Sequence, residues 1–115
     1  MTTTPTLNYT SYDEDYVLTL DLSTYANGRL AISFWYHDPD CGPAPFAKVT
    51  VNMPDDHLNE GEVFVKDWAE NENLVNYLLE QGWLTRTGRE VLSGYVAPAV
   101  MVPSGPLATY IKERS

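Results

Sequence analysis

Two stretches decide the fold of this chain: Tyr16-Val17-Leu18-Thr19-Leu20-Asp21-Leu22 and Leu30-Ala31-Ile32-Ser33-Phe34-Trp35-Tyr36. Apolar residues occupy every second position in both stretches, and this period of two predicts strands with one buried face. Asn27-Gly28 lies between them, and this dipeptide favours the positive φ values of a tight hairpin turn. The sequence therefore predicts an antiparallel hairpin, in which Trp35 faces away from the buried side.

The stretch after this hairpin predicts a loop and two more strands. Residues 38–45 contain three prolines, which remove the N–H donors of a strand interior, so a loop is expected there. Residues 46–53 alternate again and predict a third strand, antiparallel to the second. Residues 62–66 predict a short fourth strand.

A helix is predicted next, from about residue 68 to residue 81. Asp67 with Glu70 three positions later has the spacing of a helix N-cap. Leu74 and Leu78 recur at helical spacing, and Gly82 suits the left-handed position that ends a helix.

The C-terminal part of the chain predicts smaller elements. Residues 85–89 are typical of a turn, and residues 91–96 predict a fifth strand that Pro98 interrupts. Ser104-Gly105-Pro106 predicts the start of a short helix that runs through Lys112.

The expected fold class is α+β: one antiparallel β-sheet of about four to five strands, with one main helix packed on a face and a short C-terminal helix. The whole chain, residues 1–115, is expected to form a single domain. Residues 1–11 are rich in threonine and predict a flexible polar arm, and residues 98–115 predict a C-terminal extension of the sheet domain.

The composition excludes several classes of function. The 115 residues are 43% hydrophobic, so the chain can bury a core without help. Sixteen acidic residues against seven basic ones give a net charge of −9, which argues against direct binding to nucleic acid or an anionic membrane. The single cysteine, Cys41, cannot form an internal disulfide, and the first six residues lack a basic segment followed by an apolar one, so a cytoplasmic protein is expected.

The charge is unevenly distributed along the chain. Residues 1–80 contain 14 acidic and only three basic residues, whereas residues 81–115 contain two acidic and four basic ones. This pattern is typical of a solvated acidic surface, and it also fits a negative face offered to a positive partner. The candidate partner-binding residues are Asp13, Glu14, Asp15, Trp35, Asp38, Asp40, Asp55, Asp56, Glu60 and Glu62.

Metal-binding or catalytic chemistry has weaker support in the sequence. A structural zinc site takes about four N or S ligands, and only Cys41, His37 and His57 are available. Asp38 and Asp40 lie just before Cys41, and an acidic neighbourhood disfavours a reactive cysteine. Nucleotide-binding and hydrolase motifs are absent. No cofactor, metal or catalytic residue is therefore expected.

Part of the chain resembles a family of small bacterial proteins known as domain of unknown function 4313. The similar segments are Tyr25-Ala26-Asn27-Gly28-Arg29-Leu30-Ala31-Ile32, residues 45–55, Phe64-Val65, residues 78–82, Thr87-Gly88-Arg89 and Ser93-Gly94. The resemblance covers about residues 15–97, and residues 66–71 depart from it. It implies no catalytic residues, and it implies an origin in plasmids, conjugative elements or phages, whose small acidic proteins often inhibit host defence.

Three hypotheses are consistent with these observations. The first is an acidic protein that binds a basic, nucleic-acid-binding host defence complex of the CRISPR or restriction type. The second is a small enzyme, or a ligand- or metal-binding domain, with a site near His37, Cys41, Asp55 and His57. The third is a housekeeping module that associates with a second copy of itself through Trp35 and exposed sheet edges.

Overall fold

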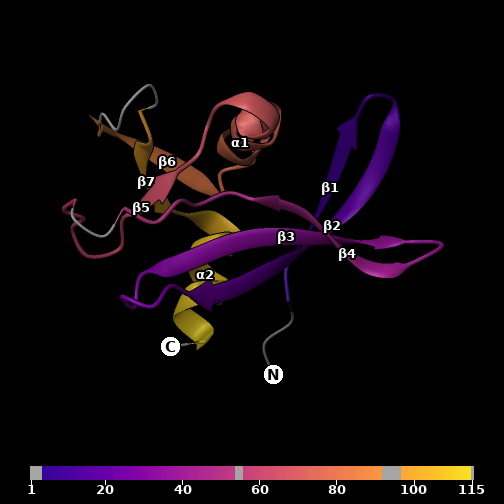
Figure 1. Ribbon diagram of the computed structural model, residues 1–115, viewed down its shortest axis with the longest axis horizontal. Helices are drawn as coiled ribbons and strands as arrows, with labels where there is room; N and C mark the ends of the chain where they lie inside the picture. Colours follow the sequence, from indigo (N-terminus) through magenta and orange to yellow (C-terminus); the bar gives the residue numbers. More distant parts are fainter. Residues whose placement is uncertain (1–3, 54–55, 92–96, 115) are drawn as a thin grey trace.

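The hairpin predicted around Asn27-Gly28 is confirmed. In the computed structural model, which describes residues 4–53, 56–91 and 97–114, β2 (Glu14–Thr24) pairs antiparallel with β3 (Leu30–Asp38) (Figure 1). Only Gly28 of the turn has a positive φ, at 84°. Its N–H donates to the Tyr25 carbonyl at 2.8 Å. The turn therefore contains one left-handed residue, whereas a type I′ turn needs two.

The N-terminal segment is a strand, so the prediction of a flexible arm is wrong for residues 6–11. β1 (Thr6–Ser11) pairs antiparallel with β2, and Leu7 and Tyr9 are buried. The two-residue turn at Tyr12 and Asp13 has φ values of 51° and 64°, as in a type I′ hairpin. The polar composition concealed a strand whose outward face carries the threonines.

The prediction of a loop over residues 38–45 is also wrong in its second half. β4 (Gly42–Lys48) pairs antiparallel with β3 and forms the edge of a sheet with the order β1-β2-β3-β4. An edge strand tolerates Pro43 and Pro45 because it needs ladder donors on one side only. The register shifts between Phe34 and Trp35, and the extra residue on β4 is Phe46.

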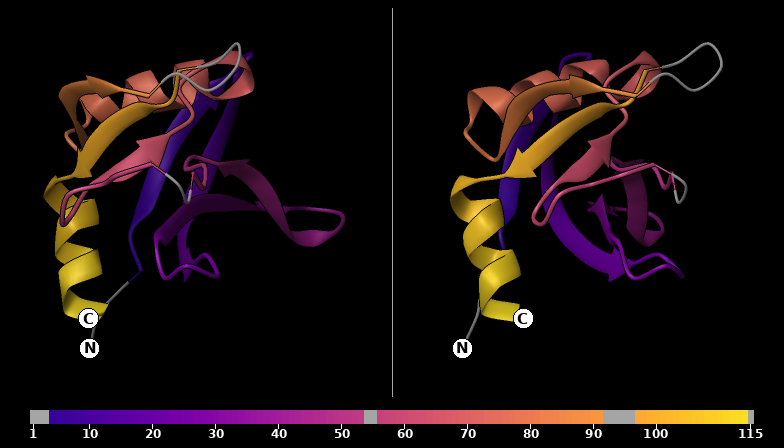
Figure 2. Two further views of the ribbon diagram at one scale, coloured as in Figure 1. Left: turned by 60° about the vertical axis from the view of Figure 1, so that its left-hand side comes forward. Right: turned by 90° about the vertical axis from the view of Figure 1, so that its left-hand side faces the viewer.

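A second sheet replaces the single sheet that we expected. It has the order β5-β7-β6 and consists of β5 (Val63–Val65), β7 (Ala99–Pro103) and β6 (Leu84–Glu90) (Figure 2). The predicted turn at residues 85–89 therefore lies within β6, whose pairing is irregular between Arg86 and Glu90.

Strand β7 is central to this second sheet and buried, so the segment after residue 98 belongs to the core rather than to an extension. The fifth strand that we predicted at residues 91–96 falls, apart from Val91, outside the described residues.

Residues 49–51 join the two sheets. The Val49 N–H donates to the Ile32 carbonyl of the first sheet at 2.9 Å, and the Val49 carbonyl accepts from Lys66 N–H at 2.8 Å. The Val51 N–H donates to the Phe64 carbonyl of β5 at 3.1 Å. The predicted third strand over residues 46–53 is thus divided between β4 and this crossover.

The main helix ends as predicted but begins differently. A short 3-10 turn, η1 (Ala69–Asn71), precedes α1 (Glu72–Glu80). Asp67 does not cap it, and its carboxylate instead accepts from Arg86 at 3.0 Å. At the other end Gly82 has a φ of 76°, and the next N–H, of Trp83, donates to the Leu78 carbonyl at 2.9 Å, which completes a glycine C-cap.

The predicted C-terminal helix is present as α2 (Gly105–Arg114). It starts close to the end of α1, because Ser104 N–H donates to the Trp83 carbonyl at 2.8 Å. Gly105 has a φ of 51°, and a Cβ there would lie 2.6 Å from the Gly82 carbonyl oxygen. Only glycine fits this approach of the two chain segments.

Both sheets and both helices share one hydrophobic core. It includes Leu18, Phe34, Val65, Leu78, Trp83, Met101 and Leu107. The architecture is therefore α+β with two antiparallel sheets of four and three strands. No helix in the described ranges is long and apolar enough to cross a membrane.

Candidate functional site

Five of the predicted partner-binding carboxylates lie at the outer turns of two hairpins of the first sheet. They are Asp13, Glu14 and Asp15 at the β1–β2 turn, and Asp38 and Asp40 at the β3–β4 turn; we call this group the hairpin end. Both hairpins lie in the right-hand half of Figure 1, with the β1–β2 turn pointing upward and the β3–β4 turn pointing to the right. Carboxylates from stretches that are distant in sequence therefore lie on two hairpins of the same sheet.

A pair of tyrosines lies at the base of the hairpin end. The Tyr16 hydroxyl donates to Glu14 at 2.8 Å, and the Tyr36 hydroxyl donates to Asp38 at 3.4 Å. The two rings meet edge to face with centroids 5.4 Å apart. The hydrogen bond to Glu14 raises the pKa of Tyr16, and loss of hydration together with the Asp38 charge raises the pKa of Tyr36.

Three of the five carboxylates of the hairpin end, Glu14, Asp15 and Asp38, accept hydrogen bonds from neutral donors. Asp38 accepts the backbone N–H groups of Asp40 at 2.8 Å and Cys41 at 3.1 Å, and these bonds lower its pKa. Asp15 accepts from the Thr10 hydroxyl at 2.6 Å. Among residues 4–53, 56–91 and 97–114, no lysine or arginine forms an ion pair with these five carboxylates. The five charges are therefore not compensated by any lysine or arginine that the structure describes, and hydrogen bonds orient three of them.

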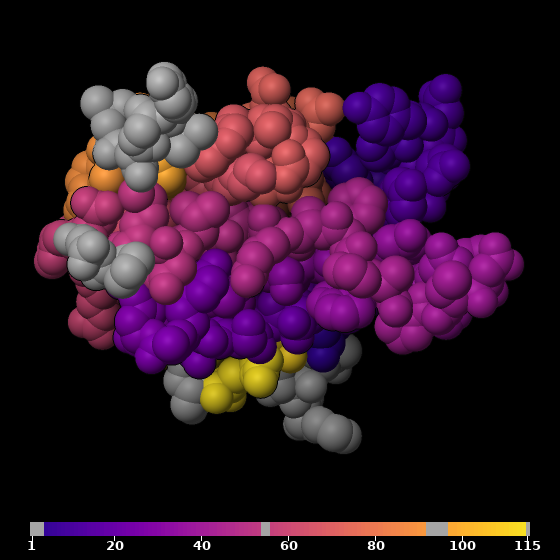
Figure 3. Space-filling view, viewed as in Figure 1, coloured from indigo at the N-terminus to yellow at the C-terminus, as the bar shows by residue number. Residues whose placement is uncertain are grey.

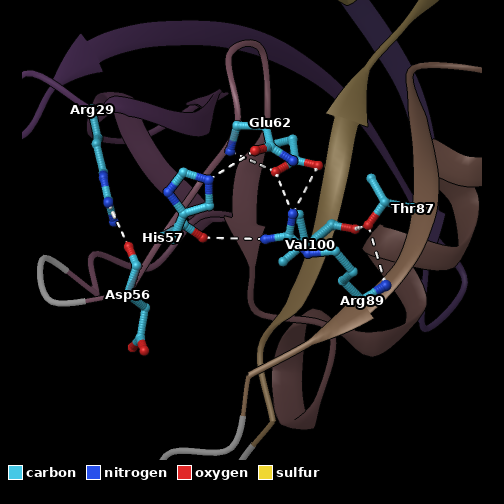
Figure 4. Close-up of polar contacts among 8 residues, drawn as sticks. Arg29, Asp56, His57, Glu62, Thr87, Arg89 and Val100 are labelled. Atoms are coloured by element: carbon cyan, nitrogen blue, oxygen red, sulfur yellow. Dashed lines mark hydrogen bonds and ion pairs between the residues drawn. The ribbon is translucent and has the colours of Figure 1, made fainter.

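The remaining predicted acidic residues lie elsewhere. Asp56, Glu60 and Glu62 belong to the loop before β5, on the opposite side of Figure 1 from the hairpin end, and Asp55 lies outside the described residues. Glu62 pairs with Arg89 at 3.1 Å and accepts the Asn59 N–H at 2.8 Å (Figure 4). The expected acidic residues thus do not share one surface, and Glu62 is neutralised locally.

The site proposed around His37, Cys41 and His57 does not assemble. His37 and Cys41 belong to the β3–β4 hairpin, whereas His57 lies in the loop before β5 and contacts Asn59 at 2.8 Å. Within the described ranges no three His, Cys, Asp or Glu side chains form a group that could hold a metal ion. Asp55, the fourth candidate, is not described.

Trp35 faces outward, as the alternation predicted. Its side chain is 37% exposed on the outer face of the first sheet, where Val17 is 59% exposed. Prolines of the edge strand lie beside it, since Trp35 pairs with Pro45 and lines a shallow pocket with Pro43. Trp35 can therefore serve as an aromatic contact for a partner.

Tyr12, the most exposed aromatic residue that the structure describes, is not among the partner-binding residues predicted from the sequence. Its side chain is 94% exposed at the apex of the β1–β2 turn, where a left-handed backbone is unfavourable for a bulky residue. The run Tyr12-Asp13-Glu14-Asp15-Tyr16, with tyrosines on both sides of three acids, is the signal that could have indicated it.

No protein-family model, curated protein or solved structure matches this chain. The resemblance to the bacterial family remains a prediction, so a function has to be inferred from the geometry and charge of the hairpin end.

Proposed function

We propose that this is a non-enzymatic binding protein of a mobile genetic element, which inhibits a host defence complex by occupying its basic, nucleic-acid-binding groove. An anti-CRISPR or anti-restriction role is the form of inhibition that we favour. The observation that carries the proposal is the hairpin end, where five uncompensated carboxylates come from two neighbouring hairpins.

Electrostatics select the kind of partner. A surface with one sign of charge attracts an oppositely charged surface over several ångströms and speeds the encounter, while like-charged partners are repelled. Grooves that bind nucleic acid are lined with lysine and arginine, so they match the hairpin end best. Nucleic acid itself would be repelled by the same carboxylates.

The hairpin end is also organised before binding. Glu14 and Asp38 each accept from a tyrosine, and the tyrosine rings pack on one another and on Phe46, at 4.9 Å from Tyr16 and 5.9 Å from Tyr36. A surface that is already ordered loses less conformational entropy on association. Three acidic side chains elsewhere differ in this respect, since ion pairs compensate the charges of Glu62, Asp67 and Glu70.

Affinity purification with charge variants tests the proposal. The bait variant is Asp13→Asn/Asp15→Asn/Asp40→Asn, and the matched control is Glu60→Gln/Glu90→Gln/Glu113→Gln, which removes the same charge from exposed residues elsewhere. From nuclease-treated bacterial lysate, the wild type and the control should capture the same basic nucleic-acid-binding protein, and the bait variant should lose it.

Two outcomes would contradict the proposal. One is capture of the same protein by the bait variant as well as by the wild type. The other is recovery of only a second copy of this chain, which would favour self-association through Trp35 or a sheet edge.

A further inference from the structure

A cleft lies between β1 and α1, beside the hairpin end. Its volume is about 460 Å³, and Figure 3 shows it as a notch between the helix and the β1–β2 hairpin. Its lining includes three tyrosines, two asparagines and one acid: Tyr9, Tyr12, Tyr77, Asn73, Asn76 and Glu80. Both walls of the cleft therefore combine tyrosine rings with polar side chains.

Two of the aromatic rings are rigidly placed. Tyr9 is only 8% exposed, and its ring centroid lies 5.4 Å from that of Tyr77 and 5.9 Å from that of Phe46. The Tyr77 hydroxyl donates to the Asn8 carbonyl of β1 at 2.7 Å, which ties α1 to the strand across the cleft. These contacts fix the wall of the cleft in the absence of a ligand.

Three polar side chains that α1 contributes to the cleft, by contrast, have no hydrogen-bond partner among the residues that the structure describes. Asn73, Asn76 and Glu80 are exposed side chains of α1, and none of them has a hydrogen bond or ion pair with another side chain in the described part of the chain. Tyr12 is exposed at the mouth of the cleft. The cleft therefore offers amide and carboxylate oxygens and an aromatic face, and its described lining contains no cationic side chain.

We propose that this cleft binds the guanidinium group of an arginine side chain on the basic partner. The inference rests on the proposed function and names the contact that the partner makes. The negative face of a tyrosine ring attracts a cation, and a planar guanidinium can stack on the ring while it donates to several oxygens at once. Glu80 and the neighbouring hairpin end supply the negative potential, so an anionic group is disfavoured.

Arginine is a better match for these groups than lysine. Its five donors are arranged in a plane, and it is more weakly hydrated than an ammonium group. Asn76 and Glu80 are four residues apart on α1, which places them on one side of the helix next to each other. A lysine could also pair with Glu80 and lie over Tyr12, but its ammonium group is more strongly hydrated and has no planar face to stack on the ring.

A titration with a short peptide tests the inference. The probe is an acetylated, amidated tetra-arginine peptide, followed by calorimetry and by amide NMR shifts of the wild-type protein at low salt. The comparison peptides are tetra-lysine and tetra-citrulline, in which the side chain keeps its shape and loses its charge. Arginine should bind most tightly, lysine more weakly and citrulline not measurably, with NMR shifts at β1 and α1.

Two substitutions locate the site. Tyr12→Asn keeps a residue that tolerates the left-handed turn, and Glu80→Gln removes only the charge. Each should weaken binding of the arginine peptide roughly two- to fivefold, and the pair roughly tenfold. The control Glu60→Gln should leave the dissociation constant unchanged within twofold.

The inference is overturned if citrulline binds as well as arginine, or if Tyr12→Asn/Glu80→Gln leaves the affinity for arginine unchanged. Its failure can be separated from failure of the proposed function. If the partner from lysate is lost with Asp13→Asn/Asp15→Asn/Asp40→Asn but is retained by Tyr12→Asn/Glu80→Gln, the acidic binding function stands and the arginine cleft falls.

Discussion

Tyr16 of β2 and Tyr36 of β3 pack edge to face, with 5.4 Å between their ring centroids, and each donates its hydroxyl to a carboxylate of the hairpin end. The acceptors, Glu14 and Asp38, lie in different hairpins. The aromatic pair therefore links the bases of two hairpins whose acidic turns are distant in sequence.

This link predicts a change in tyrosine titration. The pKa values of Tyr16 and Tyr36 are raised, so their contribution to stability is fully present below the ordinary tyrosine pKa and is lost as the pH rises through the raised values. Glu14→Gln should lower the pKa of Tyr16 toward its ordinary value, because the hydroxyl no longer faces a charge. Tyrosinate absorbance against pH measures this, and Glu60→Gln should not alter the curve.

A second prediction concerns strain in the β1–β2 turn. Tyr12 has a φ of 51°, and a left-handed conformation costs an ordinary residue about 1–2 kcal/mol. Tyr12→Asn should therefore raise the free energy of unfolding by roughly 1 kcal/mol in urea denaturation. A lower stability of Tyr12→Asn would mean that the exposed ring contributes to the fold.

A third prediction tests whether β1 is part of the core. Leu7 is 6% exposed in the hydrophobic cluster, so Leu7→Ala should reduce the free energy of unfolding by about 2–4 kcal/mol. The neighbouring Thr6 is exposed, and Thr6→Ala should change it by no more than about 0.5 kcal/mol. Equal, small effects of the two substitutions would restore the interpretation of this segment as an arm.

A fourth prediction compares two glycines that both have positive φ. A Cβ at Gly28 would meet nothing within 4 Å. Gly28→Ala should therefore reduce the free energy of unfolding by about 1–2 kcal/mol, which is the cost of a left-handed conformation for alanine. A Cβ at Gly105 would lie 2.6 Å from the Gly82 carbonyl oxygen, so Gly105→Ala should cost more. Thermal unfolding shows which of the two substitutions is more destabilising. A larger loss of stability for Gly28→Ala than for Gly105→Ala would contradict the close approach of the α1 and α2 ends.

The elements that local sequence signals specify could be predicted. Asn27-Gly28 between alternating stretches indicated the first hairpin, and Gly82 indicated the end of α1. Both depend on residues that are neighbours in the chain, and their conformational preferences act without tertiary contacts.

The errors arose where tertiary pairing decides the structure. Pro43 and Pro45 are compatible with β4 only because that strand has no neighbour on its outer side in the sheet order. The segment after Pro98 was expected to be a C-terminal extension. It forms strand β7 instead, which is buried because β5 and β6 flank it. Long-range partners of this kind leave no periodic signal in the sequence.

The residues of the candidate site could be predicted from the sequence, but which of them lie near one another could not. The acidic run at residues 13–15 and Asp38 with Asp40 were identified, and their placement on adjacent hairpins of one sheet depends on the pairing of β2 with β3. The separation of Glu60 and Glu62 from this group results from the crossover at residues 49–51 into the second sheet.

The most direct test of the central claim is the rate of association with the captured basic partner, measured over a series of salt concentrations. The wild type and Glu60→Gln/Glu90→Gln/Glu113→Gln should associate rapidly at low salt and more slowly as salt increases. Asp13→Asn/Asp15→Asn/Asp40→Asn should associate roughly tenfold more slowly at low salt, with a weaker salt dependence. Equal rates and equal salt dependence for the two triple variants would contradict a role for the hairpin end in binding.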